Sequence, residues 1–181
     1  QKMESKDLLL LIPLFVMALI PLIVGFSSDL KMEDVLYIIG FMAVVAFTEE
    51  TIFRGIILKI LQKKSNTYAI LGSCLLFSLP HIMNTLNGKN LTQTLIQILF
   101  AFVVGLILAV LAIKTNSIVL LIAYHFINNT VNSITTTNVS ETFSLLLTLV
   151  IFVIGVIYLL YLYRLIRQNG PPVEKKGPDS I

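Results

Sequence analysis

Long apolar segments alternate with short polar connections along almost the whole chain. A helix needs about 20 predominantly apolar residues to cross the hydrocarbon core of a bilayer. Six segments approach that length, at residues 8–26, 34–61, 67–84, 94–113, 118–134 and 143–166. The pattern predicts an all-α fold, a polytopic membrane helical bundle of about six transmembrane helices.

The first segment follows Lys2 and Lys6, as the apolar part of a signal peptide would. Its apolar run is longer than the usual 7 to 15 residues of such a peptide, and no A-x-A cleavage site follows. We therefore interpret it as a retained span. Pro13 and Pro21 lie inside it and predict an interrupted helix.

Composition agrees with a membrane protein. Of the 181 residues 56% are hydrophobic and 13% are charged, and the mean hydropathy is +0.91, far from the balance of a soluble domain. The net charge of +3 is small and scattered, which argues against a nucleic-acid partner. Cys74 is the single cysteine, so a disulfide within the chain is excluded.

Basic residues are distributed unequally between the two predicted sides. If the N-terminus is cytoplasmic, ten lysines and arginines face inward and only Lys31 and Lys89 face outward. This places both termini in the cytoplasm and agrees with an even number of spans. We expect a membrane domain over residues 1–167 and a disordered cytoplasmic tail over residues 168–181, which is rich in glycine and proline.

Well inside the second segment lie the charged residues Glu49, Glu50 and Arg54. A charge near the bilayer centre costs at least about 2.5 to 3.5 kcal/mol, so such residues indicate a functional site. Glu50 and Arg54 are four residues apart and share a helix face, which predicts an ion pair. Glu49 points about 100 degrees away from Glu50. We interpret Glu50 as the partner of Arg54 and Glu49 as the free carboxylate.

The chain has two histidines, and both lie in predicted spans. His81 follows Pro80 in the third segment, and we expect this proline to bend the helix. His125 and Asn129, four residues apart in the fifth segment, form a polar strip on one helix face. Phe77, one turn before His81, is interpreted as a packing residue.

These groups suit hydrolysis of a peptide bond. A carboxylate and a histidine can deprotonate a water molecule, while a second histidine and an asparagine can donate hydrogen bonds to the resulting oxyanion. Alternatively Glu49, His81 and His125 can bind a Zn ion, since two histidines and a carboxylate leave an open coordination position. Their spacing is not that of H-E-x-x-H, and it does not choose between the two.

Three short motifs occur in order on separate apolar segments. They are E-E-x-x-x-R at Glu49 to Arg54, F-x-x-x-H at Phe77 to His81, and H-x-x-x-N at His125 to Asn129. This ordered set, within about residues 33–150, resembles the CPBP family (Abi; CAAX protease and bacteriocin-processing enzymes). The resemblance implies an intramembrane protease in which Glu49 and His81 activate water, and His125 and Asn129 stabilise the oxyanion.

The same resemblance indicates the substrate and the place of action. Bacteriocin precursors, peptide pheromones and CaaX-like proteins are the implied substrates, all hydrophobic or amphipathic peptides or proteins at a lipid bilayer. We expect a multi-pass protein of a bacterial plasma membrane whose substrate arrives laterally or from the cytoplasm. The alternative is a non-proteolytic scaffold that regulates a partner such as a sensor kinase.

The predicted spans place the site residues at different depths. Glu49 falls in the inner half of its span, His125 near the middle and His81 toward the outer end. Catalysis needs them close together, so the segment limits or tilts must differ from these. We expect the second segment to turn along the cytoplasmic surface from about Ile56, where Lys59 and Lys63 would meet the headgroups.

Overall fold

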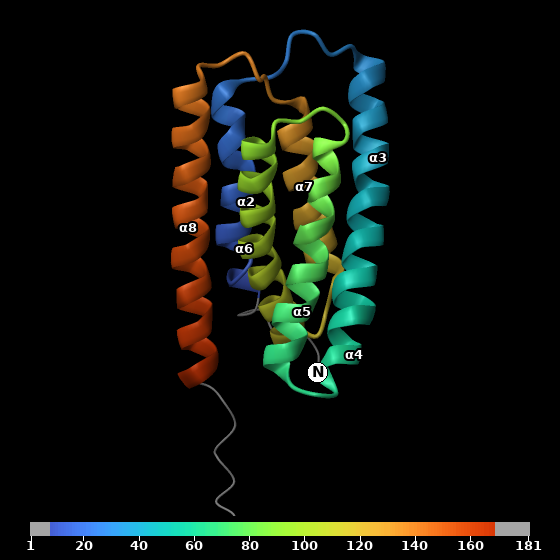
Figure 1. The fold of residues 1–181 in the computed structure, drawn as a ribbon, viewed down its shortest axis with the longest axis vertical. Coiled ribbons are helices and arrows are strands. Elements are labelled where there is room, and N and C mark those ends of the chain that lie inside the picture. Colours follow the sequence, from blue (N-terminus) through green and yellow to red (C-terminus); the bar gives the residue numbers. More distant parts are fainter. Residues whose placement is uncertain (1–7, 169–181) are drawn as a thin grey trace, which may run out of the picture.

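The computed structural model describes residues 8–168, which form a single bundle of helices running alternately up and down (Figure 1). The α-helices are α2 (Ile12–Leu19), α3 (Met32–Glu50), α4 (Leu58–Gln62), α5 (Asn66–Ser78), α6 (Leu91–Thr115), α7 (Val119–Ile134) and α8 (Glu141–Gln168). Between them lie the 3-10 helix η1 (Ile20–Val24), the π-helix η2 (Thr51–Ile57) and the 3-10 helix η3 (Leu79–Thr85). The predicted all-α class is confirmed. The tail predicted over residues 168–181 lies almost wholly outside the described residues.

Three continuous helices in the described part of the chain are long and apolar enough to cross a membrane. They are Met32–Gln62, Leu91–Thr115 and Glu141–Leu165. Helices α5 and α7 have 13 and 16 residues and are shorter than a typical span. Six spans with both termini in the cytoplasm therefore stay a prediction. Large apolar side chains such as Leu36, Val44 and Ile157 face outward, as lipid contact requires.

The first apolar segment is divided at its prolines. Pro13 lies in the first turn of α2 and Pro21 in the first turn of η1, where a helix does not need the missing N–H group. The predicted interruption of this span is present. Helix α2 packs against α7 and α8, and the Tyr158 hydroxyl donates a hydrogen bond to the Leu10 carbonyl.

The second segment is one continuous helix from Met32 to Gln62. The turn that we expected from about Ile56 is wrong, because the π-helical residues of η2 lead directly into α4. π-helical stretches inside α-helices are rare. Those that do occur are often found at functional sites. Here η2 packs against α5 and α6, so the helix is covered where its charged residues lie.

The third segment changes helix type at the predicted bend. Helix α5 begins after Ser65, whose hydroxyl accepts the Tyr68 N–H, and ends at Ser78. Pro80 lies in the first turn of η3, which packs against α6. The segment therefore continues as a tighter 3-10 helix that carries His81.

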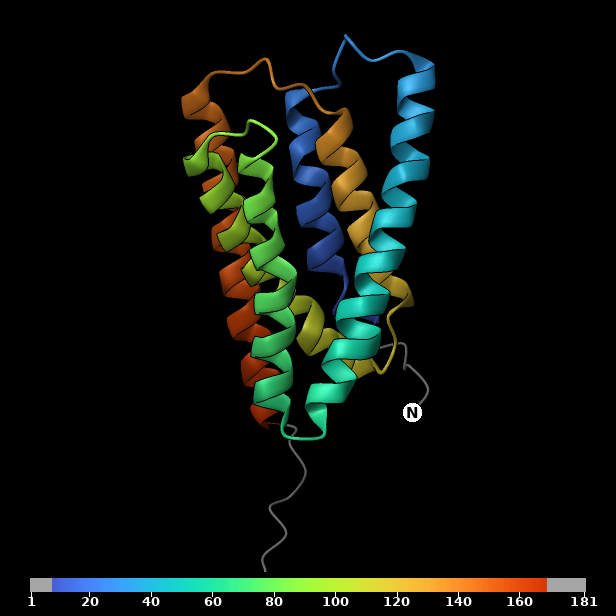
Figure 2. The same cartoon turned by 45° about the vertical axis from the view of Figure 1, so that its right-hand side comes forward.

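Helix α6 occupies the centre of the bundle and packs against α5 and α8, while α3 packs against α7 (Figure 2). Its residues Ile107, Leu108 and Leu111 are almost fully buried. At the upper end in Figure 1, the connections before α3 and after α7 are joined, since Ser27 N–H donates to the Ile134 carbonyl at 2.9 Å. The connection between η3 and α6 lies at the same end.

Candidate active site

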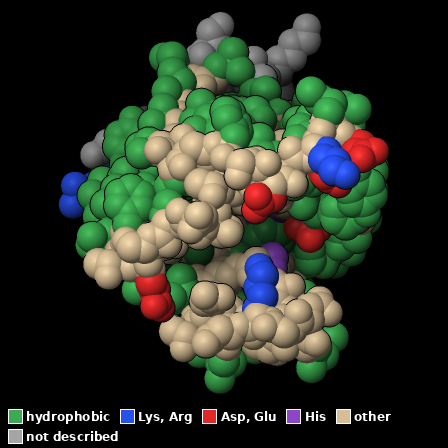
Figure 3. All heavy atoms as spheres, turned by 90° about the horizontal axis from the view of Figure 1, so that it is seen from above, with side chains coloured by type: hydrophobic (Ala, Val, Ile, Leu, Met, Phe, Trp, Pro, Cys, Tyr) green, Lys and Arg blue, Asp and Glu red, His purple; other side chains and the backbone are tan. Residues whose placement is uncertain are grey.

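A cavity of about 900 Å³ is hollowed into this upper end of the bundle, with histidine visible inside it (Figure 3). Side chains from α3, α5, η3, α6, α7 and α8 line it. His125 lies nine residues before the end of α7, which places it about 14 Å below that end at 1.5 Å per residue. The cavity therefore reaches well into the bundle.

A buried ion pair lies behind the wall of the cavity, in contact with His125. Arg54 Nη1 donates to Glu50 Oε1 at 2.7 Å, and both side chains are 0% exposed. Arg54 Nη2 also donates to the Gly105 carbonyl of α6 at 3.4 Å. The contact predicted from the four-residue spacing is present. The guanidinium thus has a carboxylate and a carbonyl as partners, which offset its removal from water.

His125 joins the two adjacent glutamates. Its Nδ1 lies 2.8 Å from Glu50 Oε1 and its Nε2 lies 3.4 Å from Glu49 Oε2. Because the Glu50 carboxylate beside Arg54 only accepts, His125 Nδ1 carries the proton and donates. Glu49 is 33% exposed while Glu50 is fully buried, so the neighbouring carboxylates have different surroundings. We name Glu49, Glu50, Arg54 and His125 the floor cluster.

Phe77 is more than the packing residue that its spacing suggests. Its ring meets His81 and His125 edge to face, at centroid distances of 5.9 and 5.7 Å. The Arg54 guanidinium carbon lies 4.2 Å from the centre of the same ring, a cation–π contact. Phe77 therefore packs against both imidazoles and the buried cation.

Helix α6 approaches this group closely because residue 105 is glycine. A Cβ atom there would lie 3.3 Å from the Phe77 ring, 3.4 Å from Arg54 Nη2 and 3.5 Å from Cys74 Cβ. The first two distances are tight for heavy atoms, so a side chain at residue 105 would force Phe77 and Arg54 to shift by a few tenths of an ångström.

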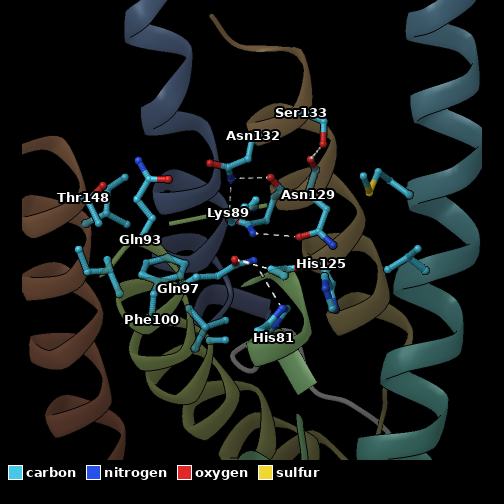
Figure 4. A pocket seen from close by; sticks show the side chains of 18 of the residues that line it. His81, Lys89, Gln93, Gln97, Phe100, His125, Asn129, Asn132, Ser133 and Thr148 are labelled. Carbon is cyan, nitrogen blue, oxygen red and sulfur yellow. Dashed lines mark hydrogen bonds between the residues drawn. The ribbon is translucent and has the colours of Figure 1, made fainter. Parts of the chain in front are cut away.

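His81 lies in the same cavity as Glu49 and His125 but has a different partner (Figure 4). Gln97 Nε2 lies 3.4 Å from His81 Nδ1, and Asn84 Nδ2 donates to Gln97 Oε1 at 2.9 Å. Since the Gln97 amide nitrogen only donates, Nδ1 accepts and the proton of a neutral His81 is on Nε2. The direct contact of the Glu49 carboxylate is with His125, at 3.4 Å, and the shared activation of water by Glu49 and His81 stays a prediction.

Asn129 lies one turn beyond His125 on α7, on the cavity wall. Its side-chain oxygen accepts a hydrogen bond from Asn128 Nδ2 at 3.4 Å. Asn128, the preceding residue on the same helix, therefore supports Asn129. All of Glu49, His81, His125 and Asn129 line one cavity.

Carboxamide side chains form much of the remaining wall. Seven of them line the cavity: Asn84, Asn90, Gln93, Gln97, Asn128, Asn129 and Asn132. We name this set the amide wall. Sequence reasoning missed most of it, although Gln93 and Gln97 are four residues apart in a strongly apolar helix. That spacing was the available signal.

A Zn site needs its ligand side chains to converge on one point. Among residues 8–168, no three histidine, cysteine, aspartate or glutamate side chains gather as a metal-holding group. Glu49 and His125 are adjacent, but His81 is held by Gln97. The three expected ligands do not fit a Zn site as they stand.

Comparison with known proteins supports the motif assignment. Neither the curated proteins nor the solved structures include a match to this chain. The family model described as "Type II CAAX prenyl endopeptidase Rce1-like" matches residues 31–131, more than half of the chain and all three motifs. The resemblance to the CPBP family is thereby confirmed. The chain belongs to the Rce1-like family of type II CAAX prenyl endopeptidases, and it is a membrane protein of the protease class.

Proposed function

We propose that the protein is an intramembrane endopeptidase that hydrolyses a peptide bond in a membrane-associated peptide or protein. The observation that carries this proposal is Glu49, a partly exposed carboxylate deep in the cavity and 3.4 Å from His125. A general base must reach the water molecule that it deprotonates, and neighbouring polar groups must set its protonation state. Glu49 meets both conditions, whereas Glu50 is enclosed by Arg54 and His125.

In the proposed reaction Glu49 removes a proton from water as the water oxygen attacks the scissile carbonyl carbon. The carbonyl electrons move to oxygen, and a tetrahedral intermediate forms. When the carbon–nitrogen bond breaks, Glu49 returns the proton to the leaving amine. His81, with its proton on Nε2, assists as a hydrogen-bond donor in the same cavity.

The oxyanion is stabilised by His125 and the Asn129 amide. A protonated imidazole donates from both nitrogens, so His125 in that form can hold Glu50 through Nδ1 and reach the oxyanion through Nε2. Glu50 fixes the ring through Nδ1 at 2.8 Å, and Arg54 fixes Glu50 at 2.7 Å. Glu50 and Arg54 are therefore positioning residues. No step passes through a metal ion, because the donor set does not fit one.

The substrate is a hydrophobic or amphipathic segment, such as a bacteriocin or pheromone precursor or a CaaX-like protein. The cavity has a volume of about 900 Å³, and seven of the side chains that line it are uncharged amides. A bacterial plasma membrane is the proposed location.

Replacement of Glu49 tests the proposal directly. We expect Glu49→Gln to lower cleavage of candidate peptides by reconstituted protein about 10²- to 10⁴-fold, the usual contribution of a general base. Glu33→Gln is the matched control, since Glu33 is an exposed carboxylate in the first turn of the same helix. Undiminished cleavage by Glu49→Gln would remove Glu49 from the mechanism.

A cellular assay separates the enzyme from a scaffold. In a strain from which the gene has been deleted, the wild-type gene should restore the lost cellular function. A triple variant with Glu49→Gln, His81→Ala and His125→Ala should not restore it. Full restoration would contradict the proposed protease and would favour the scaffold.

A further inference from the structure

The two ends of the bundle carry opposite charge in the described part of the chain. The lower end in Figure 1, where α4 meets α5 and α6 meets α7, has basic residues and no acidic ones: Lys59, Lys63, Lys64, Lys114 and Arg164. The upper end has four acidic residues, Asp29, Glu33, Asp34 and Glu141, with only Lys31 and Lys89. We name them the basic end and the acidic end.

The large cavity opens at the acidic end. Lys89, Asn90 and Glu141 line its mouth, since they lie in or beside the connections at that end. Figure 3 views the molecule from this side and shows the hollow descending between the helices.

From the basic end Glu49 and His125 are closed off. Leu58, Leu108 and Leu121 are each 1% exposed and fill the interior there. A separate cavity of about 140 Å³ at the basic end reaches Arg54, but neither Glu49 nor His125 lines it. The proposed base is therefore accessible from the mouth at the acidic end.

Lysines and arginines of short loops remain on the cytoplasmic side of a membrane, while acidic residues have little influence on the orientation of the protein. Five basic residues against two place the basic end in the cytoplasm. We propose that the cavity opens on the opposite, non-cytoplasmic side, and that the substrate is a peptide segment presented from there; the second part rests on the proposed function. Of the two routes that we expected from the sequence, lateral entry and entry from the cytoplasm, the second does not agree with this opening.

The chemistry of the amide wall indicates what kind of segment enters. A carboxamide both donates and accepts hydrogen bonds, as a peptide group does. Gln93, Asn128 and Asn132 are therefore suited to the backbone of an extended chain rather than to a charged headgroup. The substrate class is an extended peptide that has been translocated, or that is anchored in the membrane with its cleavage site on the outer side.

Cysteine labelling in intact cells tests the direction of the opening. In a Cys74→Ala background, single cysteines are placed at exposed positions of the two ends, Asn87→Cys at the acidic end and Asn66→Cys at the basic end. A third variant, Asn132→Cys, reports on the cavity wall itself. The probe is a membrane-impermeant maleimide.

We expect Asn87→Cys and Asn132→Cys to be labelled at least about tenfold faster than Asn66→Cys, which should react only after permeabilisation. Labelling of Asn66→Cys in intact cells with protection of the other two would overturn the proposal. Because labelling needs no cleavage, the result does not depend on the proposed function.

Sealed vesicles test the substrate side. Fluorogenic peptides coupled to dextran, which cannot cross a bilayer, should be cleaved by right-side-out vesicles and not by inverted ones. Vesicles with Glu49→Gln give the background. Cleavage confined to inverted vesicles would overturn the proposal. Outward labelling of Asn132→Cys without any cleavage would count against the protease and leave the direction of the opening supported.

Discussion

The floor cluster and the amide wall meet at one cavity but are built from different chemistry. The floor cluster consists of ionisable groups that contact one another; Glu49 and His125 line the cavity, while Glu50 and Arg54 are fully buried behind them. The amide wall consists of neutral side chains that are mostly half-buried or exposed. Charged groups are tolerated at membrane depth only when they are paired. The difference indicates that the floor cluster supplies reactivity and the amide wall supplies recognition and positioning.

Loss of the buried carboxylate should have the largest effect. Glu50→Gln leaves Arg54 as a buried cation without an ionised partner, which typically costs about 3 to 5 kcal/mol. We expect a corresponding loss of unfolding free energy for the purified protein in detergent. Glu49→Gln, at a side chain that is 33% exposed, should change stability far less. Equal stability of the two variants would remove the distinction between the adjacent glutamates.

Replacement of the central imidazole should act on catalysis. His125→Gln removes one proposed oxyanion donor, a change that lowers kcat about 10²- to 10³-fold in other hydrolases. His125 touches both glutamates, so unfolding should be measured beside kcat to separate a folding defect. A variant that is folded and retains kcat would contradict the proposed donor.

A variant of the amide wall should have a smaller effect. Gln97→Leu removes the donor to His81 Nδ1 and leaves Asn84 without its acceptor. A hydrogen bond contributes about 0.5 to 1.5 kcal/mol, so we expect a loss of about tenfold or less in kcat/KM. A second variant, Gln97→Glu, still accepts a hydrogen bond from Asn84 but cannot donate one to His81. We expect it to shift the pH profile of cleavage. An unchanged pH profile in both variants would show that His81 does not depend on Gln97.

Removal of metal should have the smallest effect. The three expected Zn ligands are not gathered, so cleavage should survive a chelator. Elemental analysis of the purified protein is the companion measurement. Stoichiometric Zn together with chelator-sensitive cleavage would show that the side chains rearrange to bind it and would change the proposed mechanism.

Sequence reasoning was strongest for contacts inside one helix. The Glu50 and Arg54 pair follows from a four-residue spacing, and Pro80 marked the change of helix type. Each of the three motifs contributes residues to one cavity, namely Glu49, Phe77, His81, His125 and Asn129. These are local patterns or ordered motifs, which a single sequence displays directly.

Contacts between helices could not be predicted in the same way. His125 meets Glu50 from 75 residues away, and Gln97 meets His81 from 16 residues away on another helix. Their partners depend on how the helices rotate and tilt when they pack. The π-helical turns of η2 also left no sign in the hydrophobic pattern, and the predicted turn near Ile56 was wrong for that reason.

The ion pair between Glu50 and Arg54 is contained within a single helix. Because the chain is synthesised from its N-terminus, this helix emerges before α6 and α7, which carry the Gly105 carbonyl and His125. A pair that forms locally neutralises its own charges at insertion, with no help from later helices. The four-residue spacing of Glu50 and Arg54 therefore also serves membrane insertion. It lets the helix enter the bilayer with these two charged groups already paired.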